Sequence, residues 1–149
     1  MRLEGGLHDV QLPNGLRALA WVVNDIETEF MAAADSGRAL DADWLARMPV
    51  LFRIVVMRSA FRAWPRIGKV AVPESRSRYG TYFREDAARP GVFRLRTIGG
   101  DQLNGVPASR DECIGLEQNA VWSRVHVEER LTAELRGERS RWDARLRKE

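Results

Sequence analysis

Residues 14–34 read NGLRALAWVVNDIETEFMAAA, and this stretch gives the clearest periodic signal near the start of the chain. Asn14 is a suitable helix N-cap, and Asp35-Ser36-Gly37 ends the pattern. The apolar residues recur at steps of three and four, at Leu16, Leu19, Ala20, Val23, Ile26, Phe30 and Ala34. Such spacing places one apolar stripe along a helix, so we predict an α-helix over residues 14–34.

The next residues extend the helical pattern to Trp64. Asp41 or Asp43 is expected to cap a second helix carrying Trp44, Leu45 and Met48. Pro49 either kinks that helix or begins a new one that runs to Trp64. The core stripe of this segment would be Val50, Leu51, Ile54, Met57, Phe61 and Trp64.

The middle and end of the chain differ in character. Residues 65–78 read as a loop, while 79–98 hold two aromatic and β-branched runs separated by a polar stretch ending in Pro90-Gly91, which indicates a β-hairpin. Residues 109–149 again read as helical. Alternation over Val121–Val127 leaves a strand open there, but we prefer helix because charged residues of good helix propensity follow without a breaker.

The expected fold class is therefore mainly α with one β-hairpin (α+β). The 149 residues are expected to form a single domain with a helical part at 1–64, a basic loop and hairpin at 65–108, and C-terminal helices at 109–149. The lone Cys113 excludes an internal disulfide, no secretory signal opens the chain, and the longest apolar run, Met48–Met57, is too short for a membrane span. We expect a cytoplasmic protein.

Positive charge is concentrated in the middle of the sequence. Residues 47–98 hold eleven arginines and Lys69 against three acids, whereas residues 1–46 hold three arginines against eight acids. Such a field suits an acidic partner, and arginine, which outnumbers lysine by 22 to two, suits phosphate contacts. The alternative is that the basic segment folds against the acidic N-terminal part.

Catalytic motifs are not recognisable. His8 and His126 are the only histidines and Cys113 the only cysteine, which argues against a zinc site and leaves no obvious nucleophile pair. Cys113 is expected to be a buried structural cysteine and His126 a surface histidine. No cofactor is expected, and an acid/base enzyme that the sequence does not reveal remains a third alternative.

Residues 104–131 contain a helix-turn-helix pattern. Gly115 suits the turn, Leu116 follows it, and Val121 stands where a β-branched residue packs against the first helix. In this arrangement Gln118 and Asn119 face the major groove and read base edges.

This stretch resembles region 4 of sigma factors, in which a run of the type Val-x-Ser-Arg follows the turn, here Val121, Ser123 and Arg124. It also resembles TrfB-type repressors, matched by Gly115, Leu116, Ala120 and Val121. The resemblance covers about 25 residues. It departs from the sigma pattern at Asp111, Glu117, Glu128 and Glu129, and the acids at 128 and 129 would repel phosphates.

We therefore predict a DNA-binding transcriptional regulator encoded by a phage or another mobile element. The candidate DNA-binding residues are Gln118, Asn119, Trp122, Ser123, Arg124, Arg58, Arg62, Arg78, Arg94 and Arg96. Leu131, Leu135, Trp142 and Leu146 are expected to form an apolar edge that either dimerises, as a homodimer or larger assembly, or packs within the domain. The alternative function is an assembly or adaptor protein, such as a small virion component, that docks through its basic surface and C-terminal helix.

Overall fold

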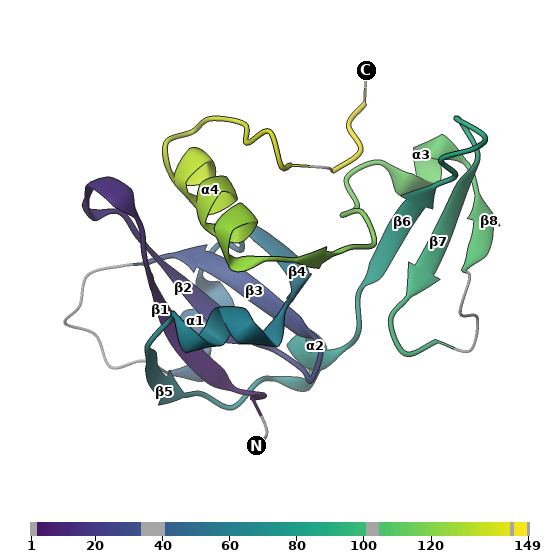
Figure 1. Ribbon diagram of the computed structural model, residues 1–149. Helices are drawn as coiled ribbons and strands as arrows, with labels where there is room; N and C mark the ends of the chain where they lie inside the picture. The colour runs from purple at the N-terminus through teal and green to yellow at the C-terminus, as the bar shows by residue number, and fades with distance from the viewer. Residues whose placement is uncertain (1–2, 34–40, 101–104, 144, 149) are drawn as a thin grey trace. The chain divides into compact units, whose positions relative to one another are not determined.

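Strands, not helices, dominate the computed structural model, which describes residues 3–33, 41–100, 105–143 and 145–148 (Figure 1). The described residues form nine β-strands and four short α-helices, so the prediction of a mainly α fold is wrong. The chain divides into two compact units. Unit 1 comprises Met1–Arg78 and Val121–Trp142, and unit 2 comprises Tyr79–Ala120 and Asp143–Glu149.

Unit 1 is built on a six-stranded sheet in the order β5-β1-β2-β3-β4-β9. Neighbouring strands are antiparallel, except that β4 and β9 run parallel. The strands are β1 (Gly6–Gln11), β2 (Arg17–Val22), β3 (Glu27–Ala32), β4 (Phe52–Val56), β5 (Arg66–Lys69) and β9 (Val121–Trp122).

The predicted helix over residues 14–34 is instead the hairpin β2–β3, with Ala34 outside the described residues. Asn24 makes the turn, because its side-chain oxygen accepts hydrogen bonds from the backbone N–H groups of Ile26 (2.9 Å) and Glu27 (2.7 Å). Asn14 caps no long helix but lies with φ 64° in the short 3₁₀ turn η1 (Pro13–Gly15) between β1 and β2. Both faces of β2 are buried, so its residues 18–22 read as a continuous apolar run, and their spacing together with Phe30 of β3 imitates a helix.

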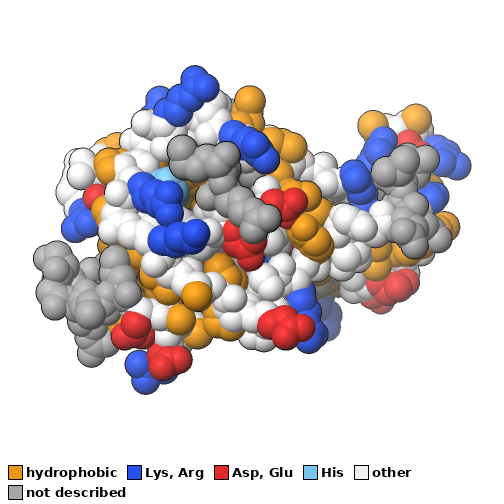
Figure 2. Space-filling view, turned by 90° about the horizontal axis from the view of Figure 1, so that it is seen from below, with side chains coloured by type: hydrophobic (Ala, Val, Ile, Leu, Met, Phe, Trp, Pro, Cys, Tyr) orange, Lys and Arg blue, Asp and Glu red, His pale blue; other side chains and the backbone are white. Residues whose placement is uncertain are grey.

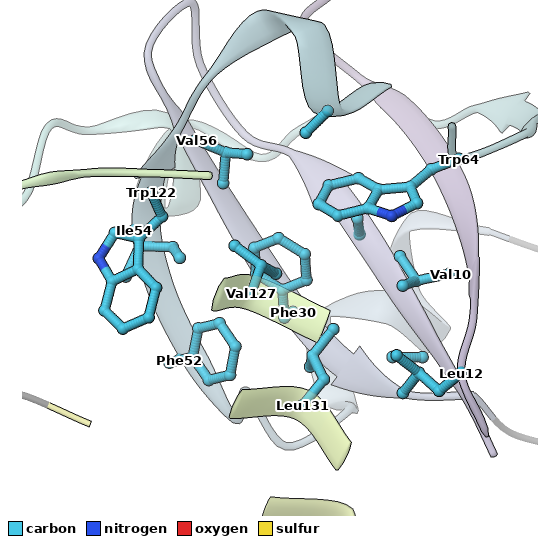
Figure 3. Close-up of a cluster of buried hydrophobic side chains, with 13 residues drawn as sticks. Val10, Leu12, Phe30, Phe52, Ile54, Val56, Trp64, Trp122, Val127 and Leu131 are labelled. Carbon is cyan, nitrogen blue, oxygen red and sulfur yellow. The ribbon is translucent and has the colours of Figure 1, made fainter. Parts of the chain in front are cut away.

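One face of the sheet packs against helix α4 (Arg124–Leu135). Figure 3 shows Val127 and Leu131 of α4 lying over Phe30 and Phe52 of the sheet.

The predicted helix from Pro49 to Trp64 is also wrong, since these residues form β4 and the 3₁₀ helix η2 (Arg58–Arg62). The alternating burial along Phe52–Val56 is the period-two pattern of a strand.

The other face of the sheet is covered in part by α1 (Ala42–Arg47). The prediction of an Asp41 cap is confirmed, because its carboxylate accepts from the Trp44 N–H at 2.7 Å. Glu27, which is fully buried, receives two hydrogen bonds from the Arg53 guanidinium, each 3.0 Å long. The segment predicted as a loop, 65–78, contributes β5 and the single-turn helix α2 (Glu74–Ser77).

Unit 2 is a three-stranded antiparallel sheet with one turn of helix. Its strands are β6 (Thr81–Glu85), β7 (Phe93–Thr97) and β8 (Val106–Ala108), and its helix is α3 (Arg110–Cys113). The prediction of a hairpin over 79–98 is confirmed by the β6–β7 pairing. Phe83, Phe93 and Cys113 form the buried core.

The C-terminal region is less helical than predicted. After α3 and β9, α4 ends at Leu135, and Gly137 follows with φ 73°. The four residues of the predicted apolar edge form no common edge, because Leu131, Leu135 and Trp142 pack in the core of unit 1 and Leu146 packs in that of unit 2. In the described part of the chain α4, with 12 residues, is the longest helix, and none is long and apolar enough to cross a membrane.

Candidate docking surface

The parallel pair β4–β9 brings together two segments that lie about 65 residues apart in the sequence. Val55 pairs with Val121 and Val56 with Trp122, and the Met57 N–H donates to the Trp122 carbonyl at 2.9 Å. Because the strands are parallel, they end at the same edge of the sheet. Arg58 is the first residue of η2 and Arg124 the first residue of α4, so the two arginines follow the ends of β4 and β9 at neighbouring positions.

Two large apolar side chains are exposed at this edge. The exposed fraction is 48% for Met57 and 64% for Val121. Val56 and Trp122 point into the core, so by strand alternation Val55 and Val121 point to the opposite side of the sheet. We call Met57, Arg58, Arg62, Val121 and Arg124 the β4–β9 surface.

The arginines of this surface differ in whether they form an ion pair with a carboxylate. Arg124 is held by Glu128, whose two carboxylate oxygens each lie 3.0 Å from its Nη1. Arg58 and Arg62 are exposed and have no carboxylate partner among the described residues.

Positive charge continues from η2 along the edge strand β5. Arg66 and Lys69 of β5 are exposed, and within the described ranges neither forms an ion pair. In the space-filling view, Lys and Arg side chains gather beside a histidine on the face seen from below (Figure 2). Arg58, Arg62, Arg66 and Lys69 thus give unit 1 unpaired cations from η2 to β5.

The segment predicted as a helix-turn-helix has a different geometry. Residues 111–127 contain the end of α3, a turn followed by an irregular stretch, β9 and the start of α4, and Val121 is exposed where a buried residue was expected. Gln118 is exposed, and Asn119 donates its backbone N–H to the Phe83 carbonyl at 2.8 Å. Both belong to unit 2, where they continue along the edge of β6.

Trp122, Ser123 and Arg124 belong to unit 1 and lie next to one another at the start of α4. Trp122 is buried and unavailable to a groove, with its ring 5.0 Å from the guanidinium carbon of Arg130. Ser123 is the N-cap of α4 and accepts from the His126 N–H. Of the three, only Arg124 presents an exposed side chain.

The remaining predicted residues are divided between the units. Arg78 is exposed at the end of the first segment of unit 1, where its carbonyl accepts from Arg53. Arg94 and Arg96 are half-buried on β7, and Arg94 donates to the Gly105 carbonyl at 2.9 Å. The β4–β9 pairing thus brings the start of η2 at Arg58 near the start of α4 at Arg124, with Arg62 at the far end of η2. Gln118, Asn119, Arg94 and Arg96 lie in unit 2.

The outward side of α4 is acidic. Glu128 and Glu129 line a groove of about 360 Å³ together with Pro13, Val125, Thr132, Ala133, Arg136 and Glu138. Hydrogen bonds from the Trp142 indole and from Arg141 lower the pKa of Glu129, so its charge is retained to lower pH. Carboxylates here oppose contact between this side of α4 and phosphates.

Residues of the kinds used in catalysis are scattered in the part of the chain that the structure describes. No group of three His, Cys, Asp or Glu side chains there is placed to hold a metal ion. Cys113 is buried as predicted, and burial raises the pKa of its thiol. His8 is buried.

Met57 and Val121 are the two members of the β4–β9 surface that the sequence pattern predicted to be buried. Both were assigned to the core of helices, and alternation along Val121–Val127 was the available signal for an exposed Val121.

Comparison with known proteins supplies no relative: no family model, no curated protein and no solved structure matches this chain.

Proposed function

We propose that this protein is a binding protein that docks on an acidic protein partner through the β4–β9 surface. The observation that carries the proposal is the exposure of Met57 and Val121 at the end of the β4–β9 pair, where η2 begins. Arg58 and Arg62, the first and last residues of η2, lack carboxylate partners among the described residues. Protein interfaces are enriched in methionine and arginine, with an apolar centre and a polar rim. Unpaired arginines at such a rim favour carboxylates on the partner.

Duplex DNA is the second candidate ligand, and regulation of transcription remains a prediction. Arg58, Arg62 and Arg66 favour it, because guanidinium groups suit phosphates. A protein partner is preferred, since phosphates make no use of exposed Met57 and Val121.

The test is a fluorescence-anisotropy titration of the purified chain with two labelled probes, an acidic peptide containing leucines and a random-sequence duplex DNA. The double variant Arg58→Glu/Arg62→Glu should weaken binding of the peptide about tenfold, which corresponds to about 1.4 kcal/mol. Arg47→Glu is the matched control, because Arg47 is also exposed and lacks a carboxylate partner in the described residues but lies on α1.

A second pair of variants separates the two ligands. Met57→Ser and Val121→Ser should weaken binding of the peptide and leave DNA binding unchanged. Equal loss for Arg47→Glu and for the double variant would contradict a local site. DNA binding that persists when peptide binding is absent would replace the proposed function with the second candidate.

A further inference from the structure

His8 is a buried histidine that connects β1 to the segment carrying Arg58 and Arg62. Its side chain is 4% exposed, and its ring centroid lies 4.9 Å from that of Phe61. Nδ1 lies 2.9 Å from the Trp64 carbonyl oxygen. A carbonyl only accepts, so Nδ1 carries the hydrogen in the neutral ring. The neutral imidazole thus fastens the end of η2 and the residues after it to the sheet.

The other ring nitrogen has no such partner. Nε2 of His8 is buried and makes no hydrogen bond to any described residue. Gly6 lies beside this nitrogen, since a Cβ atom added at Gly6 would lie 3.3 Å from Nε2. A proton on Nε2 would therefore place an unpaired N–H and a positive charge inside the protein, which is costly.

The charged surroundings of His8 add to this cost. Burial lowers its pKa below the ordinary 6.5, the hydrogen bond to Trp64 opposes that change, and the charge of Arg66 on β5 lowers the pKa further. The elements packed on His8 otherwise offer Phe61 and Trp64 from η2 and the residues after it, and Ala20 from β2. The neighbouring carboxylate, Asp9, is engaged by Arg17 at 2.9 Å.

We propose that His8 is a pH-sensitive latch: its neutral ring holds the segment from Phe61 to Trp64 against β1, and protonation releases this segment together with Arg58 and Arg62 of η2. A folded-state pKa below the unfolded value means that the released state binds the proton first as pH falls. The latched state is therefore most stable above about pH 6.5 and loses stability below it. For each unit by which the pKa of His8 is lower in the latched than in the released state, acid raises the equilibrium constant for opening about tenfold. The consequence for partner binding rests on the proposed function, whereas the latch does not.

The test uses the full chain without any partner. Hydrogen exchange of residues 57–66, corrected for the intrinsic rate, is measured at about pH 7.5 and about pH 5, which bracket the ordinary histidine pKa. We expect protection of this segment to fall at least threefold relative to α1 in the wild type and in His126→Asn, the matched histidine control. In His8→Asn, which has no titrating group, the ratio of protection should stay constant.

An equal response to pH in the wild type and in His8→Asn would overturn the latch. Should His8→Asn fail to fold, a nitrogen-15 NMR titration of the wild-type imidazole decides. A His8 pKa at or above 6.5, or hydrogen on Nε2 in the neutral ring, would also overturn it. A latch that behaves as expected in a chain that binds no acidic peptide would refute the proposed function alone.

Discussion

Replacing Glu27 with Gln should strongly destabilise unit 1. Glu27 is fully buried and receives two hydrogen bonds from Arg53 and one from the Asn24 amide (3.1 Å). Glutamine keeps the shape but removes the negative charge, so the Arg53 guanidinium loses its main counter-charge. Glu29, whose carboxylate lies 3.8 Å from Arg53, compensates only in part. Breaking a buried ion pair costs about 3–5 kcal/mol, and we expect about 3 kcal/mol here.

The assay is urea unfolding followed by tryptophan fluorescence. All five tryptophans lie in unit 1, so the signal reports on this unit. For a urea m-value of about 1–3 kcal/mol/M, the midpoint should fall by at least about 1 M. Glu74→Gln is the control, because Glu74 is exposed and its carboxylate has no described partner. A loss below about 0.5 kcal/mol for Glu27→Gln would refute the assigned role of the ion pair.

Three further predictions concern other parts of the structure. Leu131→Ala should cost unit 1 about 2–5 kcal/mol in the same urea assay, because Leu131 is fully buried. Gly105→Ala should loosen β7–β8, measured by hydrogen exchange, because its φ is +72° and the new Cβ would lie 2.3 Å from the Leu95 carbonyl. Lowering the pH through the depressed pKa of Glu129 should release Trp142 from α4, because protonation removes the charge that accepts the indole hydrogen bond. The stability that this carboxylate contributes is present above its ordinary pKa of 4.5 and is lost as the pH falls through the depressed pKa. A Trp142 indole NMR signal that stays unchanged down to about pH 2 would contradict this prediction.

Elements defined by local signals were predictable from the sequence. The β6–β7 hairpin is marked by Pro90-Gly91 between β-branched and aromatic runs, and the Asp41 cap lies at its expected place before Trp44. These signals depend on residues close together in the chain, so they can be recognised without knowledge of the tertiary contacts.

The helix assigned to residues 14–34 shows why the rest was not predictable. Leu19 and Trp21 are buried on one face of the sheet, and Ala18 and Ala20 on the other. With both faces covered, alternation between apolar and polar residues disappears, and spacing alone no longer separates strand from helix. The decisive local signal was Asn24, whose side chain builds the turn between β2 and β3.

The candidate site was predicted in its parts but not as one surface. Arg58 and Arg62 were selected for their charge and Arg124 as part of the helix-turn-helix pattern, yet the proximity of η2 to the start of α4 follows from the parallel pairing of β4 with β9. That pairing joins segments far apart in the sequence, and β9 contains only two residues. Neither its partner nor its register is encoded in a local pattern, so alternation along Val121–Val127 could indicate an exposed Val121 but not that Val121 lies beside β4.

Docking through the β4–β9 surface is tested most directly by a hydrogen-exchange footprint of the full chain with and without the acidic peptide. Protection on binding should be concentrated in residues 55–62 and 120–125, and it should be lost in Arg58→Glu/Arg62→Glu but kept in Arg47→Glu. Protection confined to unit 2, or to the acidic outer side of α4, would contradict docking through this surface, as would binding that leaves residues 55–62 unchanged.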